Sequence, residues 1–66
     1  MKRKYKIGQL IKYNNFNVSL NEHIKGYGII YGIPTKSYRH YYGLINLTPN
    51  KFSKDILILE EELELL

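Results

Sequence analysis

The residues best suited to chemistry lie in one short stretch, residues 36–42 (KSYRHYY), where tyrosines are interleaved with cationic side chains. Aromatic rings beside cations can stack on nucleobases and hold phosphates, and the same residue types often anchor protein interfaces. The alternative is that these tyrosines lie on a half-buried strand, with hydroxyl groups that reach water. On strand alternation we expect Tyr41 to face the core and His40 and Tyr42 to face outward.

Two binding roles are therefore open. For a protein interface the predicted anchors are Tyr31, Tyr38, Arg39 and Tyr42. For a nucleic-acid interface the predicted phosphate contacts are Lys2, Arg3, Lys4, Lys6, Lys36 and Arg39. The isoelectric point of about 9.4 permits the second role, although the net charge of +4 is modest and the acidic residues 60–64 would repel a nucleic-acid strand nearby. A simpler interpretation is that the basic start and the acidic end of the chain lie together and neutralise each other.

The sequence predicts no catalytic, cofactor-binding or metal site. Its two histidines, His23 and His40, are not at ligand spacing, and it contains no cysteine. The serines and threonines have no motif around them that would supply a base. The glycines of residues 26–32 do not form a phosphate-binding loop, because they follow no strand and begin no helix.

A chain of 66 residues forms at most one domain, with a small core. Its longest apolar run, residues 56–59, is too short to cross a membrane. The basic start leads into no apolar segment of the kind found in secretory signals. We therefore expect a cytoplasmic protein that does not associate with a membrane.

The elements that must position these residues are predicted to be short strands. β-Branched and aromatic residues predict a first strand over residues 7–13. The asparagines that follow favour a turn, so we predict a long loop up to residue 25, in which Ser19 and Glu22 could cap one helical turn. A hairpin of strands at residues 26–33 and 38–47 comes next, because three glycines in residues 26–32 disfavour a helix.

Residues 26–33 alternate large side chains with glycines, which indicates a strand that packs one face and permits close backbone approach on the other. The ending, residues 54–66 (KDILILEEELELL), fits a strand at 55–59, a turn at 60–62 and a strand at 63–65. As a helix the same segment would be apolar on almost every side. The predicted core residues are Leu10, Ile29, Ile45, Ile56, Ile58 and Leu63.

These five strands resemble an SH3-like barrel. The resemblance is carried by residues 7–11 (IGQLI), 26–30 (GYGII) and 61–65 (EELEL), which are similar to segments of small SH3-like proteins, many of them short bacteriophage products. Gln9 stands where that family usually has an acidic residue. The resemblance implies a strongly bent antiparallel barrel with a single 3-10 turn over residues 60–62. We place the barrel at residues 7–66, after a basic arm at residues 1–6.

The resemblance implies architecture more than activity, because SH3-like folds support many functions. The chain lacks the tryptophan with which signalling SH3 domains bind proline-rich peptides. We expect a non-enzymatic protein-binding accessory module of phage origin, which docks on a host or virion protein in the host cytoplasm. The alternative is a small nucleic-acid-binding barrel that uses its basic arm. The sequence indicates neither the partner nor the oligomeric state.

Overall fold

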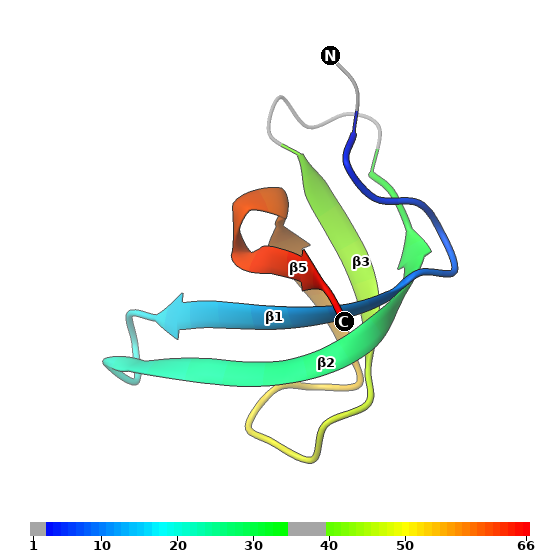
Figure 1. Ribbon diagram of the computed structural model, residues 1–66. Coiled ribbons are helices and arrows are strands. Elements are labelled where there is room, and N and C mark those ends of the chain that lie inside the picture. Colours follow the sequence, from blue (N-terminus) through cyan, green and yellow to red (C-terminus); the bar gives the residue numbers. More distant parts are fainter. Residues whose placement is uncertain (1–2, 35–39) are drawn as a thin grey trace.

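The computed structural model describes residues 3–34 and 40–66, and all strands in these residues belong to one antiparallel sheet (Figure 1). In chain order the elements are β1 (Leu10–Asn17), β2 (Glu22–Gly32), β3 (Tyr41–Asn46), β4 (Asp55–Leu59), the 3-10 turn η1 (Glu60–Glu62) and β5 (Leu63–Leu65). The strand order across the sheet is β4-β3-β2-β1-β5. The predicted all-β class, five antiparallel strands and 3-10 turn before the last strand are confirmed.

The sheet bends because its two edge strands are consecutive in the chain. Only the three residues of η1 join β4 to β5, so the two edges of the sheet must approach each other. β5 then pairs with β1, where Leu63 faces Tyr13 and Leu65 faces Ile11. Among the described residues the sheet does not close, because β4 pairs with β3 alone. The closed barrel therefore stays a prediction.

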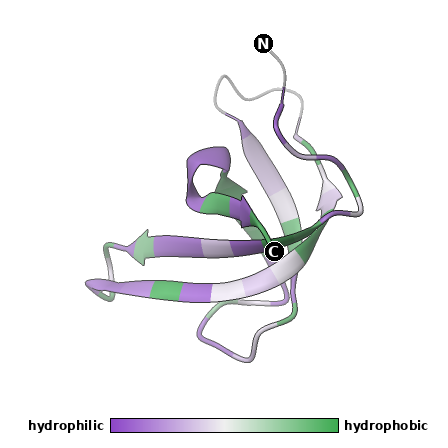
Figure 2. Cartoon of the chain, viewed as in Figure 1, coloured by the Kyte–Doolittle hydropathy of each residue, from purple (hydrophilic) through white to green (hydrophobic). Residues whose placement is uncertain are grey.

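The predicted long loop at residues 14–25 is wrong, because β1 and β2 form one continuous hairpin that projects from the sheet (Figure 1). Cross-strand contacts outweigh the turn preference of the asparagines. Asn14 Oδ1 lies 3.0 Å from His23 Nδ1, and the ring of Phe16 meets the His23 ring edge-on at 5.1 Å. The turn itself is at residues 18–21, where Asn21 adopts a φ of 52°. Figure 2 shows that hydrophilic residues dominate the distal part of this hairpin.

The core lies on the opposite face of β1, β2 and β3 from the one predicted. Its buried side chains are Tyr5, Ile11, Tyr13, Ile30, Tyr42, Leu44, Ile58 and Leu63. The predicted core positions Ile58 and Leu63 are confirmed, and Ile56 packs partly buried against this cluster. The predictions for Leu10 and Ile29 are wrong, because these side chains are 42% and 38% exposed. Ile45, on the same face of the sheet as Leu10 and Ile29, is half-buried.

The glycines of β2 explain why the large residues face outward. A Cβ atom at Gly28 would lie 2.4 Å from the carbonyl oxygen of Ile45. At Gly26 it would lie 2.6 Å from both the Tyr13 hydroxyl and the Thr48 hydroxyl. Residues 26 and 28, at inner positions of β2, are therefore small because other groups already fill that space. The alternate positions carry the bulk and point to solvent.

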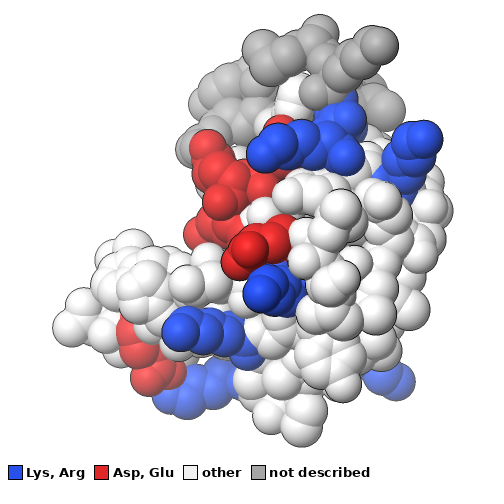
Figure 3. Space-filling view, viewed as in Figure 1, with Lys and Arg blue, Asp and Glu red and all other residues white. Residues whose placement is uncertain are grey.

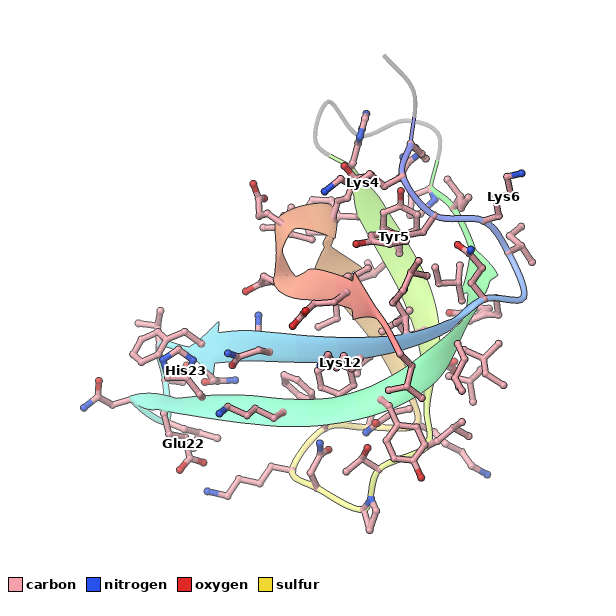
Figure 4. All side chains as sticks on the ribbon, in the orientation of Figure 1. Lys4, Tyr5, Lys6, Lys12, Glu22 and His23 are labelled. Carbon is pink, nitrogen blue, oxygen red and sulfur yellow. The ribbon has the colours of Figure 1, made fainter. Side chains whose placement is uncertain are left out.

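Residues 3–6 pack against the sheet and do not form a free arm. The Tyr5 side chain is buried, its hydroxyl donates to the Leu63 carbonyl at 3.0 Å, and its ring meets the Tyr42 ring edge-on at 5.6 Å. The Arg3 guanidinium donates to the carbonyl oxygens of Tyr41 at 2.6 Å and Pro34 at 2.8 Å. The described part of this segment therefore lies against the sheet (Figure 4).

Candidate functional site

Exposed apolar side chains cover the outer face of the sheet, on the side away from the core. They come from four adjacent strands and from the residue that follows β3. Large contiguous apolar patches on small soluble domains commonly mark interaction surfaces. We use the name outer face for these seven residues: Leu10, Tyr27, Ile29, Tyr31, Ile45, Leu47 and Leu57.

The register of the strands makes this surface continuous. Leu10 on β1 lies directly opposite Ile29 on β2, and Ile29 lies opposite Ile45 on β3. Beside this row, the Leu47 N–H donates to the Tyr27 carbonyl at 3.0 Å, which brings a second apolar pair alongside the first. Because directly opposed side chains on one face of a sheet are in contact, these residues form one surface.

Tyr31 and Leu57 extend the outer face across Gly43. The pairing of β2 with β3 shifts between Ile30 and Gly32, so Tyr31 occupies an irregular position. Its ring lies 3.2 Å from where a Cβ atom at Gly43 would be. Gly43 in turn pairs with Leu57 on the edge strand β4. Because Gly43 has no side chain, the Tyr31 ring packs directly on the sheet at this residue, and the opposite face of the ring is exposed to solvent.

Two lysines lie next to Tyr27 at one end of the outer face. Lys12 lies opposite Tyr27 in the register of β1 and β2, and Lys25 is two residues before Tyr27 on the same side of β2. Lys12 Nζ lies 3.9 Å from Glu64 Oε1, and both side chains are more than half exposed. Such an exposed pair contributes little energy, so the Lys12 ammonium group remains accessible to a partner. The Lys25 side chain is exposed as well.

The structure describes only part of the predicted protein-binding set. Tyr31 is 49% exposed and belongs to the outer face. The outward orientation predicted for Tyr42 is wrong: its side chain is 0% exposed, which excludes it as a surface anchor in this fold. Tyr38 and Arg39 lie outside the described residues. The prediction missed Tyr27, Ile29 and Leu10 as surface residues, although the glycines on the alternate positions of β2 were a usable signal.

The predicted nucleic-acid set is not assembled in the described residues. Arg3 is occupied by two backbone carbonyls and lies over the Tyr42 ring, with its guanidinium carbon 5.1 Å from the ring centroid. Lys4 and Lys6 are exposed, whereas Lys2, Lys36 and Arg39 lie outside the described residues. Figure 3 shows acidic side chains gathered over η1 and β5, with basic side chains beside them. This arrangement fits mutual neutralisation of the two ends of the chain.

A polar cluster around Glu60 fastens the start of the chain to η1. Glu60 Oε2 accepts hydrogen bonds from the Tyr42 hydroxyl at 2.5 Å and from the Lys4 N–H at 3.0 Å, and lies 3.5 Å from His40 Nδ1. The Tyr42 oxygen also accepts from the Tyr5 N–H at 3.3 Å. Within residues 3–34 and 40–66, no buried side-chain nitrogen or oxygen lacks a hydrogen-bond partner. The cluster is therefore satisfied internally, as a structural network is.

The cluster shifts the pKa values of Tyr42 and Glu60 in opposite directions. Burial raises the pKa of Tyr42, and its hydrogen bond to the carboxylate of Glu60 raises it further. Burial also acts to raise the pKa of Glu60, but the hydrogen bonds from the Lys4 N–H, Tyr42 and His40 outweigh it, so this pKa lies below its usual 4.5. At neutral pH the tyrosine is protonated and the glutamate is ionised.

The lowered pKa of Glu60 predicts an acid-dependent loss of stability. A carboxyl group with a lower pKa in the folded than in the unfolded chain contributes stability above about pH 4.5, and this contribution is lost as the pH falls through the folded pKa. We expect Glu60→Gln to lower the free energy of unfolding by about 1–2 kcal/mol at pH 7. Urea unfolding at neutral and at acidic pH measures this difference.

The matched control for this prediction is Glu64→Gln, which removes the same charge from a side chain that is 74% exposed. Its stability should stay close to that of the wild type at both pH values. The gap between wild type and Glu60→Gln should shrink under acidic conditions, because both then carry a neutral group at residue 60. A gap of equal size at both pH values would show that the charge of Glu60 is irrelevant.

Neither a metal site nor a membrane-spanning helix is found in the described residues. The described residues contain no group of three or more histidine, cysteine or acidic side chains that could hold a metal ion. In the same part of the chain no helix has the length and apolar character required to cross a membrane. Comparisons with protein-family models, with curated proteins and with solved structures find no match to this chain.

Proposed function

We propose that this chain is a non-enzymatic protein-binding module that docks through its outer face. The observation that carries the proposal is the row Leu10–Ile29–Ile45, flanked by Tyr27 and Tyr31, on three paired strands. A sheet holds the backbone beneath these side chains in a fixed position, so little backbone entropy is lost when a partner binds. Tyrosine side chains on such a surface are common anchors because they bury a large area and keep a polar end.

The partner has a definite chemistry under this proposal. It presents an apolar surface that covers the isoleucine and leucine row, bordered by carboxylates that meet Lys12 and Lys25. The apolar part supplies affinity through burial, whereas the charges at the border increase the association rate and fix the orientation. An acidic border also fits the positive formal charge of the chain, which is +4.

The proposal extends to the fold and the origin of this chain. The strand order β4-β3-β2-β1-β5, with a 3-10 turn before β5, supports an SH3-like barrel. The similarity of residues 7–11, 26–30 and 61–65 to small SH3-like phage proteins supports a phage-encoded accessory protein. Such a protein would act in the host cytoplasm and dock on a host or virion protein. Nucleic-acid binding receives less support, because Arg3 is engaged by internal carbonyl groups.

Substitutions on the outer face test the proposal by affinity capture from a nuclease-treated bacterial lysate. We expect the wild type to retain a protein that Ile29→Asp does not retain, because the new carboxylate lies in the apolar row and repels an acidic border. Tyr27→Ala should weaken binding of the purified partner by at least about tenfold, which is about 1.4 kcal/mol. Calorimetric titration of each variant measures this loss.

The matched control is Val18→Asp, which adds the same charge at a residue that is 82% exposed on the turn of the hairpin, outside the outer face. This variant should capture the partner as the wild type does. Circular dichroism confirms that each variant is folded. Equal capture by Ile29→Asp and Val18→Asp would contradict the proposal. A protein that is captured from an untreated lysate but not from the nuclease-treated lysate would also contradict it, and would favour nucleic-acid binding.

A further inference from the structure

The edge strand β4 directs a row of backbone groups away from the sheet. The Asn46 N–H donates to the Lys54 carbonyl at 2.7 Å, and the Glu60 N–H donates to the His40 carbonyl at 2.8 Å. In an antiparallel ladder, residues that bond to the neighbouring strand alternate with residues that do not. The even-numbered residues of β4 therefore bond to β3, whereas Asp55 and Leu57 point their N–H and C=O groups outward.

This edge lacks three of the features that protect natural edge strands from pairing. Natural edge strands are protected by prolines, bulges or inward-pointing charges. The β3–β4 register is unbroken from Tyr41 to Ile45, and the strand sequence DILIL contains no proline. Its inward-pointing Ile58 is buried in the core, and the side chain of Leu57 is 61% exposed. The strand is a regular apolar template with an accessible edge.

The charges beside β4 favour one occupant over others. Lys54 and Asp55 are at the beginning of the strand, and the acidic turn Glu60–Glu62 follows its end. If two copies pair antiparallel about Leu57, Leu57 lies opposite Leu57 of the second copy and Asp55 lies opposite Leu59. Lys54 of each copy then lies beside the acidic turn of the other copy. Opposite charges in this arrangement favour the antiparallel pairing of two identical edges.

We propose that β4 is a self-association edge, through which two copies of this chain pair antiparallel to form one sheet of ten strands. Leu57 is at the two-fold axis, where the outer faces of both copies become continuous. The association adds backbone hydrogen bonds between the outward groups of Asp55 and Leu57 and the edge of the second copy, as in other cases of strand addition. It is distinct from the docking of another protein through the isoleucine row.

Sedimentation equilibrium of the purified chain, from micromolar to near-millimolar concentration, tests this proposal. We expect the wild type to show a concentration-dependent equilibrium between monomer and dimer. Leu57→Lys should weaken dimerisation by at least about tenfold, because it opposes two ammonium groups at the axis. Leu57→Pro should do the same, because proline removes an N–H that points outward and leaves the β3–β4 ladder intact.

Lys54→Glu is a second test that does not change the apolar strand. It places a carboxylate beside the acidic turn of the second copy and should weaken the dimer, more strongly at low salt than at high salt. Lys25→Glu makes the same charge change on β2 and should leave the dimer unchanged. Circular dichroism monitors folding of all four variants.

Three outcomes would overturn the proposal. The first is a wild type that stays monomeric at the highest concentration, and the second is a dimer that is insensitive to Leu57→Lys. The third is a dimer that is lost with Ile29→Asp but retained with Leu57→Lys, since this would place the contact on the outer face. Partner capture by Lys54→Glu separates the two proposals, because Lys54 is exposed and lies outside the outer face: a monomeric variant that still retains the partner leaves the proposed function unaffected.

Discussion

Ile30→Ala is expected to lower the free energy of unfolding by about 2–5 kcal/mol, the range for truncating a buried isoleucine. The Ile30 side chain is 0% exposed and packs in the core cluster. A domain of 66 residues has a typical total stability of roughly 3–10 kcal/mol, so this change removes a large share of it. Urea unfolding followed by circular dichroism measures the loss.

The neighbouring residue supplies the matched control. Ile29→Ala deletes the same atoms from a side chain that is 38% exposed on the outer face. Because these atoms are partly in water in the folded protein, their removal should cost less than about 1.5 kcal/mol. Equal losses for the two variants would mean that both faces of β2 are equally buried, and a larger loss for Ile29→Ala would mean that the core lies on the other face.

The sequence predicted the elements well because their signals are local. The β-branched residues of 55–59 and the glycines of 26–32 both disfavour a helix, and the acidic run 60–62 between apolar segments indicates a turn. Each of these signals lies within a few residues of the structure that it predicts. The structure has a strand or a 3-10 turn in each case.

The face of the sheet that forms the core was harder to predict. A period of two shows that alternate residues share a face, but it does not show which face is inside, and an error of one residue exchanges the two faces. The large side chains of Tyr27 and Ile29 led to the prediction that their face of the strand forms the core. The correct assignment depends on Tyr13, Thr48 and the backbone of Ile45, which fill the space over the β2 glycines. These groups come from other parts of the chain.

Contacts between distant residues account for the other errors. Tyr5 is buried because its ring packs against Tyr42 and its hydroxyl donates to the Leu63 carbonyl. No sequence pattern near residue 5 predicts this burial. Asn46 is another residue whose surroundings the sequence did not indicate: its Oδ1 accepts from the Tyr13 hydroxyl at 2.6 Å, and its Nδ2 donates to Asn50 Oδ1 at 3.0 Å. An asparagine that fastens a loop by such bonds has the same local signature as one in an exposed turn.

Gly28 provides the sharpest test of close packing between β2 and β3. In Gly28→Ala the new Cβ atom would lie 2.4 Å from the Ile45 carbonyl oxygen and 3.2 Å from the Ile45 carbonyl carbon. Both are backbone atoms of a central strand, so relief requires the strands to separate. We expect a loss of at least about 1–3 kcal/mol in the free energy of unfolding, the range for overpacked interiors. The midpoint of urea unfolding measures it.

Gly32→Ala is the matched control for this prediction, because it adds the same methyl group to the same strand. A Cβ atom at Gly32 meets nothing within 4 Å, and the backbone there is not in the left-handed region. Replacing such a glycine restricts the unfolded chain, so the variant should match the wild type or gain about 0.4–1 kcal/mol. The difference between the two variants therefore isolates the contact with Ile45. If Gly28→Ala were as stable as Gly32→Ala, the close approach of β2 to β3 at this residue would be refuted.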